Sequence, residues 1–303
     1  MDFLYFYQNI PLYINPVAFT IGPFSVRWYA VSYIVGFLVA YLVLIRRIKK
    51  GEYVVNEQGA GDKGQKRNAV HCALVMDFLL VAFFSALVGA RLGYVLIYDP
   101  AFFISNPLAI ISPFDQAGNF VGIFGMSYHG GLAGVILGGI IFCGFKKINF
   151  WRWADFVVPA VPLGYFFGRI GNFLNGELYG RVTTSPLGMY FSSDPQNLRY
   201  PSQLLEAFLE GLLLFFVVLG VRRYGHRYER RYEPLAGFFR KDGMLLAVYI
   251  AGYGIFRIIA EQFRQPDPQI GLISGYFTIG QILSLFMVIL GALIIFRNRK
   301  QML

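Results

Sequence analysis

Long apolar segments alternate with short polar gaps along most of the chain. A helix needs about 20 mostly apolar residues to cross the roughly 30 Å hydrocarbon core of a bilayer. Seven segments approach or reach that length: Trp28–Ile45, Ala73–Tyr98, His129–Phe145, Trp153–Ile170, Leu204–Val221, Met244–Ala260 and Tyr276–Phe296. The pattern predicts an all-α integral membrane protein with about seven transmembrane helices, forming a single polytopic membrane domain over 1–303.

Proline and aromatic residues modify this outline at three places. Pro159 and Pro162 lie inside the fourth segment and predict a kink, which helix bundles tolerate. Residues 1–27 are aromatic and almost uncharged, which indicates an interfacial arm on the membrane surface. The apolar stretch 101–111 is short and contains Pro107, so we expect an interfacial or re-entrant piece there.

The basic residues predict the orientation. They gather in the gaps at 46–67, 146–152, 222–241 and 297–300, whereas the alternate gaps hold only Arg27, Arg181, Arg199 and Arg264. By the positive-inside rule, the N-terminus is outside and the C-terminus is cytoplasmic. The polar, glycine-rich stretch 51–70 is then a cytoplasmic loop, and 171–202 is an extracytoplasmic loop region.

Composition agrees with a membrane protein and narrows the chemistry. Hydrophobic residues make up 56% and charged residues 15% of the chain, against about 45–50% and 25% in soluble domains. The net charge of +10 follows from cytoplasmic loops, so it does not call for nucleic acid. Neither Cys72 nor Cys143 belongs to a motif, and no zinc-site, Ser-His-Asp or phosphate-loop signature is present. We therefore expect neither a metal nor a cofactor.

Ionisable residues inside the sixth segment suggest a functional site. Tyr253, Arg257 and Glu261 follow one another at steps of four, and Arg264 comes three residues later. These steps place all four on one helix face. Because charges in a membrane are costly, function is the first hypothesis. The alternative is that Arg257 and Glu261 form a purely structural ion pair.

The fourth segment ends in Gly-Arg-Ile-Gly-Asn-Phe-Leu-Asn-Gly-Glu-Leu-Tyr-Gly at 168–180. Its glycines permit positive φ and close backbone approach. The segment can therefore curl around a ligand, with Arg169 offering a forked donor to a phosphate and with Asn172 and Glu177 nearby in the sequence. An ordinary helix-ending turn is the alternative interpretation.

The third segment begins with His129, at the same predicted depth as Arg169 and Glu261. A lone histidine is more often a satisfied polar residue than a catalyst, and that alternative stays open here. Gly130, Gly134 and Gly138 follow at steps of four, the spacing that lets membrane helices pack closely. We interpret this glycine stripe as structural.

Two further segments bring polar groups to the outer level. Tyr29 lies at the outer end of the first segment, where an interfacial belt tyrosine is the simpler interpretation. The fifth segment enters with Gln203, Glu206 and Glu210, and each neighbouring pair is spaced for one helix face. Polar groups from five segments thus converge near the outer surface, which predicts a site for a ligand with a charged head and apolar tails.

Together these residues closely resemble the bacterial prolipoprotein diacylglyceryl transferase family. The resemblance is carried by Ser-Tyr-His-Gly-Gly-Leu at 127–132, the long motif at 168–180, Pro-Ser-Gln-Leu at 201–204, and Arg257 to Glu261 running into Phe-Arg-Gln-Pro-Asp at 263–267. It extends from Arg27 to the last segment. One departure is Tyr200, where many members have His.

The resemblance implies transfer of a diacylglyceryl group from phosphatidylglycerol to the lipobox cysteine thiol of preprolipoproteins, releasing glycerol phosphate. It implies that this happens on the outer side of the bacterial plasma (inner) membrane, among membrane lipids. It further implies roles for individual residues. The implied roles are His129 as base, Arg169 and Arg257 on the lipid phosphate, Asn172 and Glu177 on the head group, Glu261 fixing Arg257, Tyr29 and Tyr253 as hydroxyl donors, and Gly180, Gln203 and Arg264 as further substrate-binding positions.

Two other classes of protein could use the same polar residues. A transporter or flippase of a phosphorylated lipid would need broken spans and polar groups near the midplane. The polar groups here favour one side instead. A structural scaffold would leave the costly charges unexplained.

Overall fold

The computed structural model describes residues 3–22, 24–53, 64–112, 114, 125–227, 241–266, 271–273 and 275–300. Most of the described residues are helical. The chain divides into two compact units. The large unit comprises Met1–Leu44 and Ala154–Leu303, and the small unit comprises Ile45–Trp153.

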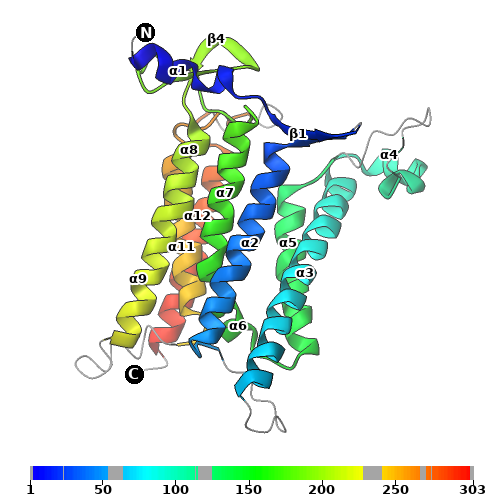
Figure 1. Cartoon of the computed structure of the whole chain (residues 1–303), viewed down its shortest axis with the longest axis vertical. Coiled ribbons are helices and arrows are strands. Elements are labelled where there is room, and N and C mark those ends of the chain that lie inside the picture. The colour runs from blue at the N-terminus through cyan, green and yellow to red at the C-terminus, as the bar shows by residue number, and fades with distance from the viewer. Residues whose placement is uncertain are drawn as a thin grey trace. The chain divides into compact units, whose positions relative to one another are not determined.

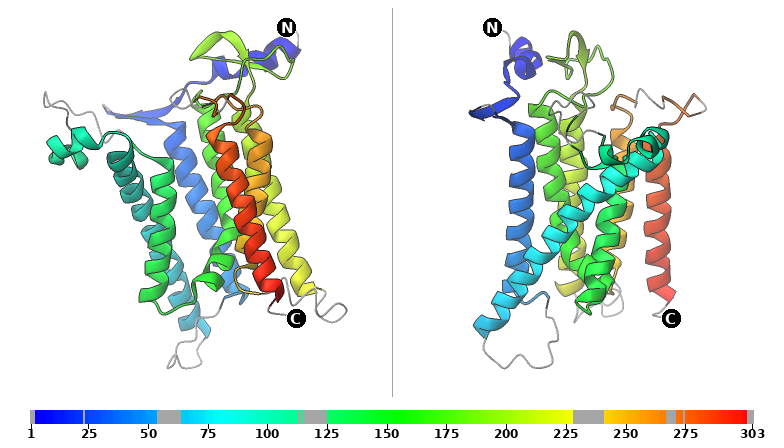
Figure 2. Two further views of the ribbon diagram at one scale, coloured as in Figure 1. Left: turned by 180° about the vertical axis from the view of Figure 1, so that it is seen from behind. Right: turned by 90° about the vertical axis from the view of Figure 1, so that its right-hand side faces the viewer.

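The large unit is a bundle of long helices that run side by side (Figures 1 and 2). Its members are α2 (Trp28–Lys49, of which the part up to Leu44 belongs to this unit), α6 (Phe150–Val157, of which the part from Ala154 belongs to this unit), the 3₁₀ turn η2 (Val158–Ala160), α7 (Val161–Leu174), α8 (Ser202–Glu206), the π-helical segment η3 (Ala207–Leu213), α9 (Leu214–Arg227), α11 (Met244–Ala260) and α12 (Ile279–Lys300). Buried apolar side chains from η2, α9 and α11 form a core around Leu214 and Val218.

Two short antiparallel hairpins and one helix accompany the bundle at one end (Figure 1). The hairpin β1 (Val17–Ile21) with β2 (Phe24–Arg27) leads directly into α2. Helix α1 (Phe3–Tyr13) packs on β3 (Met189–Phe191), which pairs with β4 (Asp194–Arg199). Phe173, Met189 and Phe191 form the buried core of this part, and the Tyr7 hydroxyl donates to the Leu187 carbonyl at 3.1 Å.

The small unit consists mainly of α3 (Gly64–Ile97) packed along α5 (Tyr128–Phe145) (Figure 2). The short helix α4 (Pro100–Ser105) and the 3₁₀ turn η1 (Pro107–Ile110) follow α3. Arg91 of α3 donates to the carbonyls of Ala109, Ile110 and Gly125 at 2.6, 2.8 and 3.2 Å. Its guanidinium therefore satisfies carbonyls that the irregular chain leaves open.

Small residues set the close approach of α3 to α5. A Cβ added at Gly130 or Gly134 would collide with the backbone of Gly89 or Ser85, and one at Gly138 with the Ser85 side chain. Only glycine fits at these positions without separating the helices. The predicted structural role of the stripe Gly130, Gly134 and Gly138 is confirmed.

Each of the seven predicted apolar segments coincides with helix. Among the residues that the structure describes, five helices are long and apolar enough to cross a membrane: Trp28–Lys49, His71–Ile97, Tyr128–Phe145, Ser202–Gly225 and Ile279–Arg299. The sixth segment, Met244–Ala260, is apolar but shorter. The fourth is interrupted by the turn η2 around Pro159, as its prolines predicted.

Some boundaries differ from the sequence-based expectation. The predicted loop 51–70 ends earlier, because α3 already begins at Gly64, and 54–63 lie outside the described residues. The four short strands within the described residues were not predicted, since each is only three to six residues long. The 171–202 region contains the last turn of α7 and both strands β3 and β4.

Replacement of Gly134 by Ala should weaken the packing of α5 on α3. The added methyl meets the Ser85 carbonyl, so we expect a loss of about 1–3 kcal/mol of stability. The matched control is Gly144→Ala in the same helix, where nothing lies within 4 Å of the added carbon. Thermal unfolding of the purified protein in detergent measures both. Equal midpoints for the two variants would contradict this account of the stripe.

Candidate active site

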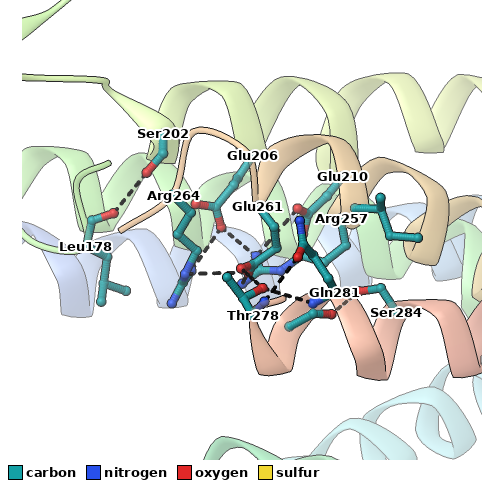
Figure 3. A network of polar contacts seen from close by, with 12 residues as sticks. Leu178, Ser202, Glu206, Glu210, Arg257, Glu261, Arg264, Thr278, Gln281 and Ser284 are labelled. Carbon is teal, nitrogen blue, oxygen red and sulfur yellow. Dashed lines mark hydrogen bonds and ion pairs between the residues drawn. The ribbon is translucent and has the colours of Figure 1, made fainter. Parts of the chain in front are cut away.

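Glu206, the last residue of α8, is the centre of a buried charge cluster. Its side chain is 0% exposed, and its Oε2 atom forms ion pairs with three arginines, which belong to α7, to α11 and to the segment after α11. The distances are 2.7 Å to Arg257, 3.0 Å to Arg169 and 3.3 Å to Arg264. Figure 3 shows Arg257 and Arg264 directed at this carboxylate. A buried charge is tolerated only when it is paired, and here each charge has partners of the opposite sign.

Arg257 lies between three carboxylates. Besides Glu206, its terminal nitrogens reach Glu261 at 2.7 Å and Glu210 at 3.5 Å. Arg257 and Glu261 are one helical turn apart, so the spacing of four alone brings them together. Arg169, Arg257 and Arg264 thus balance Glu206, Glu210 and Glu261 in number, which makes the cluster formally neutral.

The beginning of α12 anchors Glu261. Thr278 precedes the helix, and its hydroxyl accepts from the Gln281 N–H while the Gln281 side chain accepts from the Thr278 N–H. This reciprocal pair is a capping box. The Thr278 hydroxyl also donates to Glu261 Oε2 at 2.7 Å (Figure 3). The same residue therefore starts α12 and fixes the carboxylate that holds Arg257.

The segment 168–180 curls back beside the cluster. Arg169 Nη1 donates to Asn172 Oδ1 at 3.4 Å, and Asn172 Nδ2 donates to Glu177 Oε1 at 2.9 Å. Gln203, which is completely buried, donates to the Glu177 carbonyl at 2.7 Å. Gly176 adopts a φ of +69°, in the left-handed region that glycine enters at no steric cost. Helix α7 therefore ends in an ordinary glycine turn, with the Gly176 N–H donating to the Phe173 carbonyl at 3.0 Å and the Glu177 N–H to the Asn172 carbonyl at 3.1 Å, as the alternative interpretation predicted. A curl around a ligand stays a prediction.

Hydrogen bonds tie this curl to the end of α11. The Gly180 N–H donates to the Tyr200 carbonyl at 2.8 Å, and the Arg181 N–H donates to the Phe263 carbonyl at 2.9 Å. A Cβ at Gly180 would collide with the Phe263 carbonyl. Gly180 thus lets two backbone segments meet next to Arg264.

The cluster can still bind an anion. A guanidinium carries five N–H donors. Arg169 uses one from each nitrogen, on Tyr165, Asn172 and Glu206, so donors are left for a ligand. Two arginines that are 12% exposed, aligned by carboxylates in an apolar bundle, suit a phosphate group better than an uncharged ligand.

Comparison with known proteins identifies the family of the chain. The family described as "Prolipoprotein diacylglyceryl transferase" matches residues 16–297. A Rickettsia bellii (strain OSU 85-389) relative named "Phosphatidylglycerol--prolipoprotein diacylglyceryl transferase" is 40% identical over 285 residues, covering 94% of this chain and 95% of its own. A relative of the same name from Chlorobaculum tepidum is 40% identical over 296 residues, covering 96% of this chain and 92% of its own.

The chain belongs to the prolipoprotein diacylglyceryl transferase family. It is a membrane protein and a transferase. The resemblance inferred from its motifs is thereby confirmed.

Most of the residues predicted for the transferase site lie in the large unit. Arg169, Arg257, Glu261 and Arg264 share one cluster, and Asn172, Glu177 and Gln203 adjoin it through hydrogen bonds. The Tyr253 ring packs edge-on against Tyr165 at 5.8 Å. The Tyr29 hydroxyl donates to Tyr33 at 2.9 Å, and the Tyr29 side chain is partly exposed near the start of α2.

His129 belongs to the small unit. It is exposed in the first turn of α5, which begins where the Ser127 hydroxyl accepts from the Gly130 N–H at 3.3 Å. Its ring meets Tyr128 edge-on at 5.7 Å. Its role in the site stays a prediction.

Four residues that hold the buried charge cluster together had no assigned role in the sequence-based prediction of the site: Tyr165, Glu206, Glu210 and Thr278. Glu206 and Glu210 carried a usable signal, because two carboxylates on one face of an apolar segment need cationic partners. Thr278 carried the weaker signal of a Thr-x-x-Gln capping box. Tyr165 carried none, since tyrosine is common in membrane helices.

Removal of the central carboxylate should destabilise the fold strongly. Glu206→Ala leaves three guanidinium groups without their shared partner, and we expect a loss of about 3–5 kcal/mol. Asp77→Ala is the control, because Asp77 pairs with Lys146 where both side chains are more than 40% exposed. Its expected loss is below about 1 kcal/mol. Folded yield and thermal midpoint in detergent measure both, and a Glu206→Ala protein as stable as the control would contradict the assignment.

Proposed function

We propose that this protein transfers the diacylglyceryl group of phosphatidylglycerol to the lipobox cysteine of a preprolipoprotein, with release of glycerol phosphate. The observation that carries the proposal is the convergence of Arg169 and Arg257 on the buried Glu206 in a chain of this family. The names of its relatives mention phosphatidylglycerol and the prolipoprotein.

The chemistry requires a thiolate and a stabilised leaving group. The cysteine sulfur forms a bond to the carbon of the diacylated glycerol that bears the phosphate. The bond from that carbon to the phosphate oxygen breaks, and glycerol phosphate leaves. The thiol proton passes to a base, because only the thiolate attacks well and the ordinary thiol pKa is about 8.5. The released phosphate monoester gains negative charge. Arg169 and Arg257 are placed to stabilise that charge inside the bundle.

The remaining residues have supporting roles in this proposal. Glu261 aligns Arg257, while Asn172 and Glu177 orient the head group beside Arg169. Tyr29 and Tyr253 supply hydroxyls, and His129 takes the thiol proton. Gly180, Gln203 and Arg264 shape and hold the walls of the substrate site.

We also propose that the protein crosses the bacterial plasma (inner) membrane seven times, with its N-terminus outside and its active site at the extracytoplasmic side. The arrangement of the large unit supports this. The cluster lies where α7 and α11 end and near the beginnings of α8 and α12. These helix ends lie at one end of the bundle (Figure 1). Arg222 and Arg223 lie near the far end of α9, Lys241 precedes α11, and Arg297 lies in the last turn of α12. Basic residues mark the cytoplasmic side.

The aromatic N-terminal region supports an interfacial position in the same orientation. Phe3, Tyr5 and Phe6 of α1 are 81%, 55% and 49% exposed, while the buried face of α1 packs on β3. The hairpin β1–β2 continues into α2 and exposes Ile21 and Phe24. In our proposal these side chains rest in the outer interface of the bilayer.

The direct test incubates purified protein with phosphatidylglycerol and a lipobox peptide, followed by gel shift of the peptide. We expect Arg169→Ala to lose transfer by at least about 100-fold, as for removal of a donor to developing charge. Arg91→Ala, compared at equal folded protein, should lose much less, because Arg91 bonds to backbone carbonyls. Lipid movement without peptide modification by the unaltered protein would instead support a transporter.

The assignment of His129 predicts a separate loss. His129→Gln keeps a polar side chain but removes the titrating group, so transfer should fall by about 10²- to 10⁴-fold. The fall should be smaller when the pH is above the pKa of the peptide thiol, because the thiolate then forms without a base. Transfer by the variant at close to the normal rate at neutral pH would remove His129 from this role.

A further inference from the structure

Arg169 is held at Nε as well as at its terminal nitrogens. Tyr165 lies one turn earlier on α7, and its hydroxyl accepts from Arg169 Nε at 2.7 Å. The Arg169 guanidinium carbon lies 4.8 Å from the centre of the Tyr165 ring. The phenol therefore contacts the guanidinium through its ring and through its oxygen.

The direction of this hydrogen-bond chain is fixed. Arg169 Nε–H can only donate and the Glu210 carboxylate can only accept, so the Tyr165 hydroxyl donates to Glu210 Oε2 at 2.5 Å. Glu210 is completely buried, and its other oxygen lies 3.5 Å from Arg257. Glu210 thus connects to Arg169 through Tyr165 and to Arg257 directly.

A rare backbone conformation sets Glu210 in this place. Ala207–Leu213 is π-helical and directly follows Glu206, and Glu206 and Glu210 both face the arginines. Such segments are uncommon and frequently occur at functional sites. Gly211 lies against Phe166 of α7, where an added Cβ would approach the Phe166 side chain within 3 Å. This tight contact fixes the distance between Glu210 and Tyr165.

We propose that Tyr165, oriented by Glu210, is a positioning residue that aims the Arg169 guanidinium at the lipid phosphate during diacylglyceryl transfer. The inference rests on the proposed function. An arginine side chain has several rotatable bonds, and the hydrogen bond at Nε fixes the plane of its donors. Catalysis by such donors depends on their orientation before the reaction begins. Tyr165 touches no reacting atom in this proposal and acts only through Arg169.

Tyr165→Phe tests the hydroxyl while the ring keeps its packing on Arg169 and Tyr253. We expect kcat for transfer to a lipobox peptide to fall about tenfold, the value of one hydrogen bond to a charged group, with KM for the peptide unchanged. Tyr41→Phe, three turns along α2 from Tyr29, is the matched control and should leave both constants unchanged. An unaltered kcat in Tyr165→Phe, with the unaltered protein active, overturns the inference.

A second pair of variants separates positioning from packing. Glu210→Gln keeps an oxygen that accepts from Tyr165, so it should retain more transfer than Glu210→Leu, which has no acceptor. Adding Tyr165→Phe to Glu210→Leu should cost much less than adding it to the unaltered protein, because both changes break one chain. If Tyr165→Phe does not fold, equal kcat values for Glu210→Gln and Glu210→Leu overturn the inference. An unaltered protein without transfer activity would refute the proposed function itself.

Discussion

The structure depends on pairing charges within an apolar helix bundle. An isolated carboxylate or guanidinium at that position would cost several kcal/mol, so each must find a partner from a neighbouring helix. Glu206 of α8 is that partner for three arginines, one each from α7, α11 and the segment after α11. Because one oxygen serves all three, the ends of these elements are fixed relative to one another by the same atom that organises the candidate site.

Local features at the helix ends bring the charged side chains to that atom. Asp155 accepts from the N–H groups of Gly243 and Leu246 and so caps the beginning of α11, while the Thr278 box begins α12 beside the end of α11. Small residues then bring the helices close. A Cβ at Gly280 would lie against the Glu261 carboxylate, and one at Gly171 against Ser32 of α2. Stability and chemistry thus use the same contacts, since an altered helix packing would also move the arginines.

The sequence predicted the helices well because their signal is strong. Runs of about 20 apolar residues have few alternatives to a helix, and Pro159 correctly indicated the break before α7. The short strands were not predicted, because three to six residues with mixed burial show little hydrophobic periodicity. Their position depends on tertiary contacts, such as those between Tyr7 and Leu187, which join residues far apart in the chain.

Helix periodicity alone predicts the candidate site one helix face at a time, whereas the convergence of polar groups from five segments followed from the predicted topology. The spacing of four residues from Arg257 to Glu261 and from Glu206 to Glu210 predicted which side chains share a helix face. Both faces contribute side chains to the cluster. Periodicity does not state which helix lies opposite, so it gave Arg257 a partner on its own helix and missed the equally short contact to Glu206. Tyr165 shows the same limit more sharply. Its importance arises from a π-helical turn in another segment that places Glu210 against its hydroxyl, and no property of residues 161–174 alone reveals that turn. Residue spacing thus determines which side chains share a helix face, whereas helix packing determines which side chains of neighbouring helices they contact. The proposed chemistry of this protein depends on those contacts.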